Sequence, residues 1–169
     1  MTADLVFMMG NFEARFPTDR LYAKNHMWAQ AVDQAGNVVP GTTDQVTTGQ
    51  PTRLRLGLSA YAVRLLQDVY FLDLTIEPAM NLKSKQEIGS IESKKAESSL
   101  YTPSAGTVVS VNSKLIDDPT AINLDKYGAG WLFELATNVE LFCQPDQYLQ
   151  HLQAAWEVAQ RTIKGQVNA

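Results

Sequence analysis

Short apolar segments separated by turn-forming residues recur along this chain, and they limit the folds open to it. In Arg53–Leu58 leucines alternate with arginines, which is typical of a half-buried strand. Asp68–Leu74 is mostly apolar and predicts a strand buried on both faces. Further short segments predict strands: Leu21–Val32, Ile88–Ile91, Leu100–Tyr101, Thr107–Asn112 and Trp131–Leu135. Many short strands with turns between them predict a mostly β chain, a small sandwich or barrel with helices added at its periphery.

Two helices are expected at the edges of this β domain. Ser59 is a plausible N-cap for a short helix after the second strand region. The second helix begins near Gln144, with Pro145 at its first position, and Gly165 is expected to end it. Apolar residues recur along it at helical spacing: Tyr148, Leu149, Leu152, Ala155, Trp156, Ala159 and Ile163. We expect this stripe to dock on the parent domain, with a partner-binding face as the alternative.

The expected organisation has three parts. Residues 1–20 form an amino-terminal arm, residues 21–143 the β domain, and residues 144–169 a helix packed on that domain. The arm is expected to pack on the domain, and a partner contact is the alternative. Residues 33–52 are rich in Gly, Thr, Gln and Pro and are expected to form a long loop.

Charge and cysteine content exclude some classes of protein. The formal net charge of the 169-residue chain is −4, which argues against nucleic-acid binding, since that draws affinity from Lys and Arg on phosphates. Its apolar runs are too short to span a membrane. Cys143 is the chain's one cysteine, has apolar neighbours, and is expected to be a buried, inert thiol. A lone cysteine fits a reducing compartment, so we expect a cytoplasmic protein.

Several motifs that would indicate catalysis or metal binding are weak in this chain. His26 and His151 lie far apart and lack ligand spacing, so no metal site is expected. The segment Gly128–Gly130 lacks the third glycine of a dinucleotide-binding loop. No Ser, Cys or Thr has the surroundings of an activated nucleophile, and no catalytic residue is predicted.

Five ordered segments in the second half of the chain change this interpretation. They are Glu92-Ser93-Lys94-Lys95-Ala96, Tyr101-Thr102-Pro103-Ser104-Ala105-Gly106, Val111-Asn112, Ile122-Asn123 and Tyr127-Gly128-Ala129-Gly130-Trp131-Leu132. In order and spacing they resemble the glycine cleavage system H protein family. The resemblance extends upstream through Tyr22–Trp28, Gly57–Ala62 and Asp68–Tyr70. It covers roughly residues 20 to 160.

The resemblance implies a lipoyl/biotinyl-type barrel-sandwich hybrid that works as a carrier and not as an enzyme. In that family the lysine after Glu-Ser-x carries lipoate, which implies covalent attachment at Lys95 rather than Lys94. Glu92, and Gly106 on the returning strand, are implied to serve recognition by the attaching ligase. Biotinyl carriers flank their lysine with methionines, whereas Lys95 lies between Lys94 and Ala96, which favours lipoate.

The implied partners are a pyridoxal-phosphate glycine decarboxylase, a tetrahydrofolate-dependent aminomethyltransferase, a flavin-containing dihydrolipoyl dehydrogenase, and a lipoate ligase or lipoyl transferase. The lipoyl group on Lys95 would shuttle an aminomethyl group between the first two enzymes, and the third would reoxidise its dithiol.

Departures from the family pattern leave two alternatives open. Lys94 replaces a usually apolar residue, Met27 an acidic residue, and Gln67 a glycine; Glu97 adds charge beside Lys95. One alternative is an H-like lipoate carrier of another pathway, such as sulfur-compound oxidation. The other is an unmodified interaction module of the same fold, because composition alone reads Lys94-Lys95 as a solvated turn.

Overall fold

A computed structural model describes residues 4–39 and 51–168, with side chains described as far as residue 161. Most of the loop predicted over residues 33–52 lies outside the described residues. The strands are β1 (Leu5–Met9), β2 (Phe12–Phe16), β3 (Leu21–Tyr22), β4 (Met27–Ala31), β5 (Thr52–Leu58), β6 (Val69–Leu74), β7 (Asn81–Leu82), β8 (Glu87–Ser93), β9 (Glu97–Tyr101), β10 (Gly106–Val111) and β11 (Trp131–Thr137). The helices are α1 (Ala60–Leu66), α2 (Ser113–Asp117), α3 (Thr120–Leu124) and α4 (Pro145–Asn168), with a 3-10 turn at Val139–Leu141.

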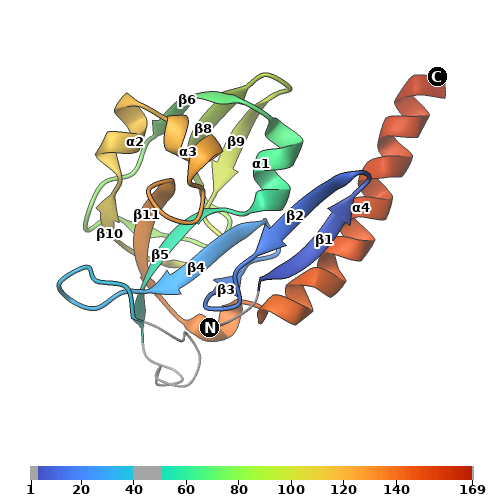
Figure 1. The fold of residues 1–169 in the computed structure, drawn as a ribbon. Helices are drawn as coiled ribbons and strands as arrows, with labels where there is room; N and C mark the ends of the chain where they lie inside the picture. Colours follow the sequence, from blue (N-terminus) through green and yellow to red (C-terminus); the bar gives the residue numbers. More distant parts are fainter. Residues whose placement is uncertain (1–3, 40–50, 169) are drawn as a thin grey trace.

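Two sheets pack face to face around the main core (Figure 1). The larger has the order β3-β4-β5-β11-β10-β7, and the smaller has the order β6-β8-β9. Leu54 and Leu56 of the larger sheet and Ile88 and Ile91 of the smaller sheet are fully buried in that core. The arrangement is a sandwich without a closed barrel, which confirms the mostly β prediction.

The alternation predicted for Arg53–Leu58 is confirmed in β5. Its leucines face the core while Arg53 and Arg55 lie on the opposite face, as the period of two in a strand requires. Both guanidiniums bind the carboxylate of Glu134 on the neighbouring strand β11, at 2.6 Å and 3.0 Å. Glu134 is almost fully buried, so this pair of ion pairs supplies the charge compensation that a buried carboxylate needs.

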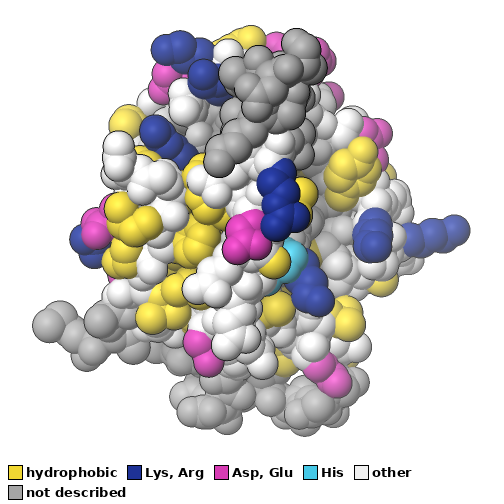
Figure 2. Space-filling model, turned by 90° about the vertical axis from the view of Figure 1, so that its right-hand side faces the viewer, with side chains coloured by type: hydrophobic (Ala, Val, Ile, Leu, Met, Phe, Trp, Pro, Cys, Tyr) yellow, Lys and Arg dark blue, Asp and Glu magenta, His cyan; other side chains and the backbone are white. Residues whose placement is uncertain are grey.

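A second cluster joins the hairpin β1–β2 and helix α4 to the β domain. The hairpin β1–β2 lies along α4 in Figure 1, and Phe16, Tyr148 and Leu152 are fully buried there. The Tyr22 and Tyr148 rings stack with centroids 4.8 Å apart. On the face of the molecule that carries α4, hydrophobic side chains and charges of both signs are interspersed (Figure 2).

Three details differ from the expectations. β6 was expected to be buried on both faces, yet Tyr70 and Phe71 are 64% and 45% exposed, and a register shift between Val69 and Phe71 interrupts the regular alternation of faces there. Helix α4 passes through Gly165 and ends at Asn168. The short helices α2 and α3 were not predicted, since five residues are too few to show a helical period.

Candidate functional site

Lys94, Lys95 and Ala96 form the exposed tip of the β8–β9 hairpin. Ser93 closes the turn: its N–H donates to the Ala96 carbonyl at 2.9 Å, and its hydroxyl accepts the Ala96 N–H at 3.2 Å. The serine of the Glu-Ser-x-Lys segment therefore has a structural task, because one buried side chain satisfies the polar groups of the turn that follows it.

The carboxyl end of α1 braces this tip from the side. Leu66 offers its carbonyl to the Lys95 N–H at 3.2 Å and to the Ser93 hydroxyl at 2.6 Å. The Lys94 N–H donates to the Gln67 carbonyl at 3.1 Å. Gln67 and Asp68 have φ values of 52° and 42°, an uncommon conformation for residues other than glycine, where the chain leaves α1. The tip is thus fixed through its backbone, and its lysine side chains stay exposed.

The two other predicted residues occupy different surroundings. Glu92 lies on β8 between Phe71 of β6 and Glu97 of β9, and directly opposed residues of antiparallel strands project from the same face. An exposed aromatic ring therefore shares a sheet face with two carboxylates near Lys95. The sequence missed Phe71 because its apolar surroundings predicted a buried strand.

Gly106 lies on β10 in the larger sheet, paired with Leu82, and not at the tip. A Cβ at this position would lie 2.4 Å from the Ala136 carbonyl oxygen on β11. The glycine thus permits close packing of two strands. Its proposed part in ligase recognition stays a prediction.

A groove of about 200 Å³ begins beside the tip. Leu66, which receives the Lys95 N–H, lines it together with Leu65 and Ala62 of α1. The opposite wall is the open edge of β9, and the far end is formed by Asn25–Met27. The lining is apolar or neutral, and no Asp or Glu of the described residues belongs to it.

His26 at the far end of the groove is held as a neutral imidazole. Burial and the neighbouring His151 lower the pKa of His26 to about 4. Its Nδ1 lies 2.9 Å from the Tyr148 hydroxyl, which also lies 2.9 Å from the Ser59 hydroxyl. Ser59 thus precedes α1 as predicted, but its side chain serves this network and makes no capping hydrogen bond.

The described residues contain no group of three His, Cys, Asp or Glu side chains that could hold a metal ion. Among the described helices, none is long and apolar enough to cross a membrane. Cys143 was expected to be buried, but it is only partly buried and lines a separate cavity.

A presented lysine on a braced hairpin, with a groove beside it, is the architecture of a carrier domain. Comparison with known proteins identifies the family of carriers to which this chain is similar. The sequence model of the family described as "Glycine cleavage H-protein" matches residues 20–162. The chain is 35% identical over 144 residues to the glycine cleavage system H protein of Stenotrophomonas maltophilia strain R551-3, covering 83% of this chain and 96% of that protein.

Another relative and a solved structure support the same family. The Nocardia farcinica H protein is 35% identical over 119 residues, which is 70% of this chain and 76% of that one. The crystal structure of the Mycobacterium marinum H protein superposes with a TM-score of 0.65 at 29% identity, covering 82% of this chain and 99% of that one. The chain belongs to the glycine cleavage H-protein family. Proteins of this family carry lipoate, are carriers rather than catalysts, and work with the P, T and L proteins of the system. The expected lipoate-carrier role is confirmed.

Proposed function

We propose that the Nζ of Lys95 carries lipoate as an amide. The observation that supports this is the bracing of the tip: the Lys95 N–H is tied to Leu66 while its side chain is exposed. A ligase must take the lysine into its own active site, so an exposed turn with a fixed backbone lowers the entropy lost on docking. Amide formation joins the lipoyl carboxyl carbon to Nζ, releases the elements of water, and removes the ammonium charge.

The groove beside the tip is proposed to shelter the lipoyl arm. Once the ammonium charge is gone, the lipoyl arm is a long apolar chain. The groove walls, which include Leu65 on one side and Tyr101 on the other, are apolar or neutral. Burying apolar surface of the arm in the groove stabilises the docked arm by roughly 25 cal/mol of free energy per Å² removed from water. The protein supplies the tether and orientation, and the lipoyl disulfide supplies the chemistry.

The cycle implied by the family would bring this arm to a pyridoxal-phosphate decarboxylase, an aminomethyltransferase and a dihydrolipoyl dehydrogenase. Tethering keeps each intermediate at a high effective concentration near the next enzyme. Glu92, with the neighbouring Phe71, is proposed as the surface that a lipoate ligase or lipoyl transferase contacts. The three-part division of the chain and its cytoplasmic location remain predictions.

The experiment is the intact mass of the protein after co-expression with a lipoate ligase. We expect a gain of one lipoyl group in the wild type and in Lys94→Arg, and no gain in Lys95→Arg. A gain in Lys95→Arg together with a loss in Lys94→Arg would move the attachment by one residue. An unmodified wild type would favour the interaction module instead.

One observation favours a second candidate, an H-like carrier of another pathway. An aminomethyl group on the lipoyl arm is a primary amine that takes up a proton readily. The groove offers it no carboxylate from the described residues. Met27 lines the groove at the position where the family pattern given above has an acidic residue. The groove therefore provides no counter-charge for this cargo. Loading of methylamine from glycine by a competent decarboxylase would support the glycine cleavage cycle. Failure of loading by a fully lipoylated sample would favour the second candidate.

A further inference from the structure

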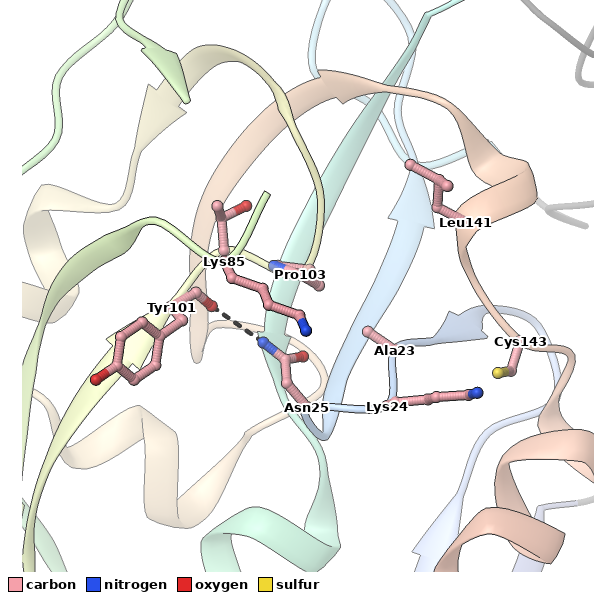
Figure 3. A pocket seen from close by; sticks show the side chains of 9 residues that line it. Ala23, Lys24, Asn25, Lys85, Tyr101, Pro103, Leu141 and Cys143 are labelled. Atoms are coloured by element: carbon pink, nitrogen blue, oxygen red, sulfur yellow. Dashed lines mark hydrogen bonds between the residues drawn. The ribbon is translucent and has the colours of Figure 1, made fainter. Parts of the chain in front are cut away.

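A second cavity, separate from the lysine tip, lies on the other side of Asn25 and Tyr101. It has a volume of about 540 Å³, within the range of roughly 300–1,000 Å³ usual for small-molecule pockets. Figure 3 shows its lining side chains, which come from four segments far apart in sequence, around residues 24, 85, 102 and 142. The Asn25 side-chain amide donates to the Tyr101 carbonyl at 3.0 Å, and both residues also line the groove beside the tip.

The cavity walls are largely apolar. Ala23, Pro103, Leu141 and Cys143 supply apolar surface, and Leu141 is 62% exposed. When a ligand covers a large leucine that is this exposed in the wall of a cavity, the burial of apolar surface stabilises the complex.

Two ammonium groups complement these walls. Figure 3 shows the Lys85 side chain directed toward Asn25, and the Lys24 side chain extending to the side of the pocket where Cys143 lies. Neither lysine forms an ion pair with another described residue, and no Asp or Glu of the described residues lines the cavity. In a chain of net charge −4, this pairing makes the cavity locally cationic.

The polar wall groups are already satisfied within the protein. The Thr102 hydroxyl donates to the Ser104 carbonyl at 2.8 Å, and the Lys85 N–H donates to the Thr102 carbonyl at 3.1 Å. The two ammoniums are therefore the charged groups left to fix a ligand's orientation, beside the Asn25 side-chain amide. No arginine of the described residues lines the cavity, so it lacks the fork that holds several phosphate oxygens at once, and two lysine point charges can neutralise a single carboxylate.

We propose that this cavity binds an amphiphilic monocarboxylate, a molecule with an apolar body of about octanoate size and one terminal carboxylate. The body lies against Pro103, Leu141 and Cys143, and the carboxylate lies between Lys24 and Lys85. The proposal does not depend on lipoylation of Lys95.

The backbone at Lys85 makes a clean test possible. Its φ is 65°, a left-handed conformation that favours glycine. Lys85→Gly therefore removes the ammonium while relieving backbone strain, so the fold is expected to persist. Lys24→Gln removes the other charge, and Lys83→Gln, an exposed lysine outside the cavity, is the matched control.

The experiment is an NMR titration of the unmodified, ¹⁵N-labelled full chain with octanoate and with the neutral octanamide. We expect saturable shifts at residues 23–25, 101–103 and 141–143, with a dissociation constant on the order of 1 mM. Octanamide, Lys24→Gln and Lys85→Gly should each weaken binding about three- to fivefold, the strength of one solvated charge pair. Lys83→Gln should bind as the wild type does. Equal affinity for the two probes, unchanged affinity in both cavity variants, or no saturable shift at these residues would overturn the proposal.

Discussion

The hairpin tip and the aromatic cluster around Tyr148 lie near opposite ends of the same groove, and they are stabilised in different ways. At the tip, backbone groups of Lys94 and Lys95 make the bonds, and the side chains are exposed. In the cluster, side chains make the bonds: the Tyr148 hydroxyl contacts both His26 and Ser59. A presented side chain such as that of Lys95 can therefore be replaced at little cost to the fold, because backbone hydrogen bonds hold the turn that carries it.

The largest effect on stability is expected for Tyr148→Ala. This change empties a fully buried ring position that stacks on Tyr22 and edge-packs on Phe16, and it should lower the free energy of unfolding by about 3–5 kcal/mol. Urea denaturation measures it. Tyr148→Phe keeps the ring and loses only the hydroxyl bonds, so it should cost about 1–3 kcal/mol. Equal losses in the two variants would contradict the assigned role of the ring.

Acidification should weaken the cluster around Tyr148. The folded pKa of His26, about 4, lies below its unfolded value of about 6.5, so the unfolded state binds a proton more readily. The free energy of unfolding is therefore unaffected by the titration of His26 above pH 6.5. It falls as the pH drops toward 4, by up to about 3 kcal/mol. His26 has a φ of 73°, which asparagine tolerates. Unfolding titrations from pH 7 to 4 should therefore show a smaller fall for His26→Asn than for the wild type. Parallel curves would disprove this.

Ser93→Ala tests a side chain on which the tip depends. It removes the bond to the Leu66 carbonyl and leaves that carbonyl and the Ala96 N–H without this partner, so we expect a loss of about 1–2 kcal/mol. It should also slow lipoylation of Lys95, because the turn is no longer held in one geometry. The rate is followed by intact mass. Full stability with normal modification would mean that α1 does not brace the tip through this residue.

Lys95→Ala is expected to have the smallest effect on stability and the largest on modification. Its side chain is exposed, so the free energy of unfolding should change by less than about 0.5 kcal/mol. Lipoylation should be lost completely. A loss comparable to that of Ser93→Ala would show that the lysine side chain itself supports the hairpin and would erase the contrast between the two regions.

The sequence predicted those parts of the fold whose pattern is local. Alternation in Arg53–Leu58 marked β5, and Pro145 marked the start of α4. It failed where burial depends on a partner. Phe71 is apolar but exposed, since nothing in the described chain covers the outer face of the small sheet at that position. Glu134 is charged but buried, because two arginines on the adjacent strand compensate it.

The position of the lysine tip could be predicted from the amino-acid sequence, since the order of the segments around Lys95 matches a family pattern. How that tip is held, and what lies beside it, depends on contacts between segments that are distant in sequence. Ser93 and Leu66 are 27 positions apart, yet they share a hydrogen bond. Helix α1, the edge of β9 and the Asn25 loop form a neutral groove, while Lys24 and Lys85 line a separate cavity. A periodic pattern reports the face on which a side chain lies, but contacts across the fold depend on how the sheets and helices pack, which no local pattern contains.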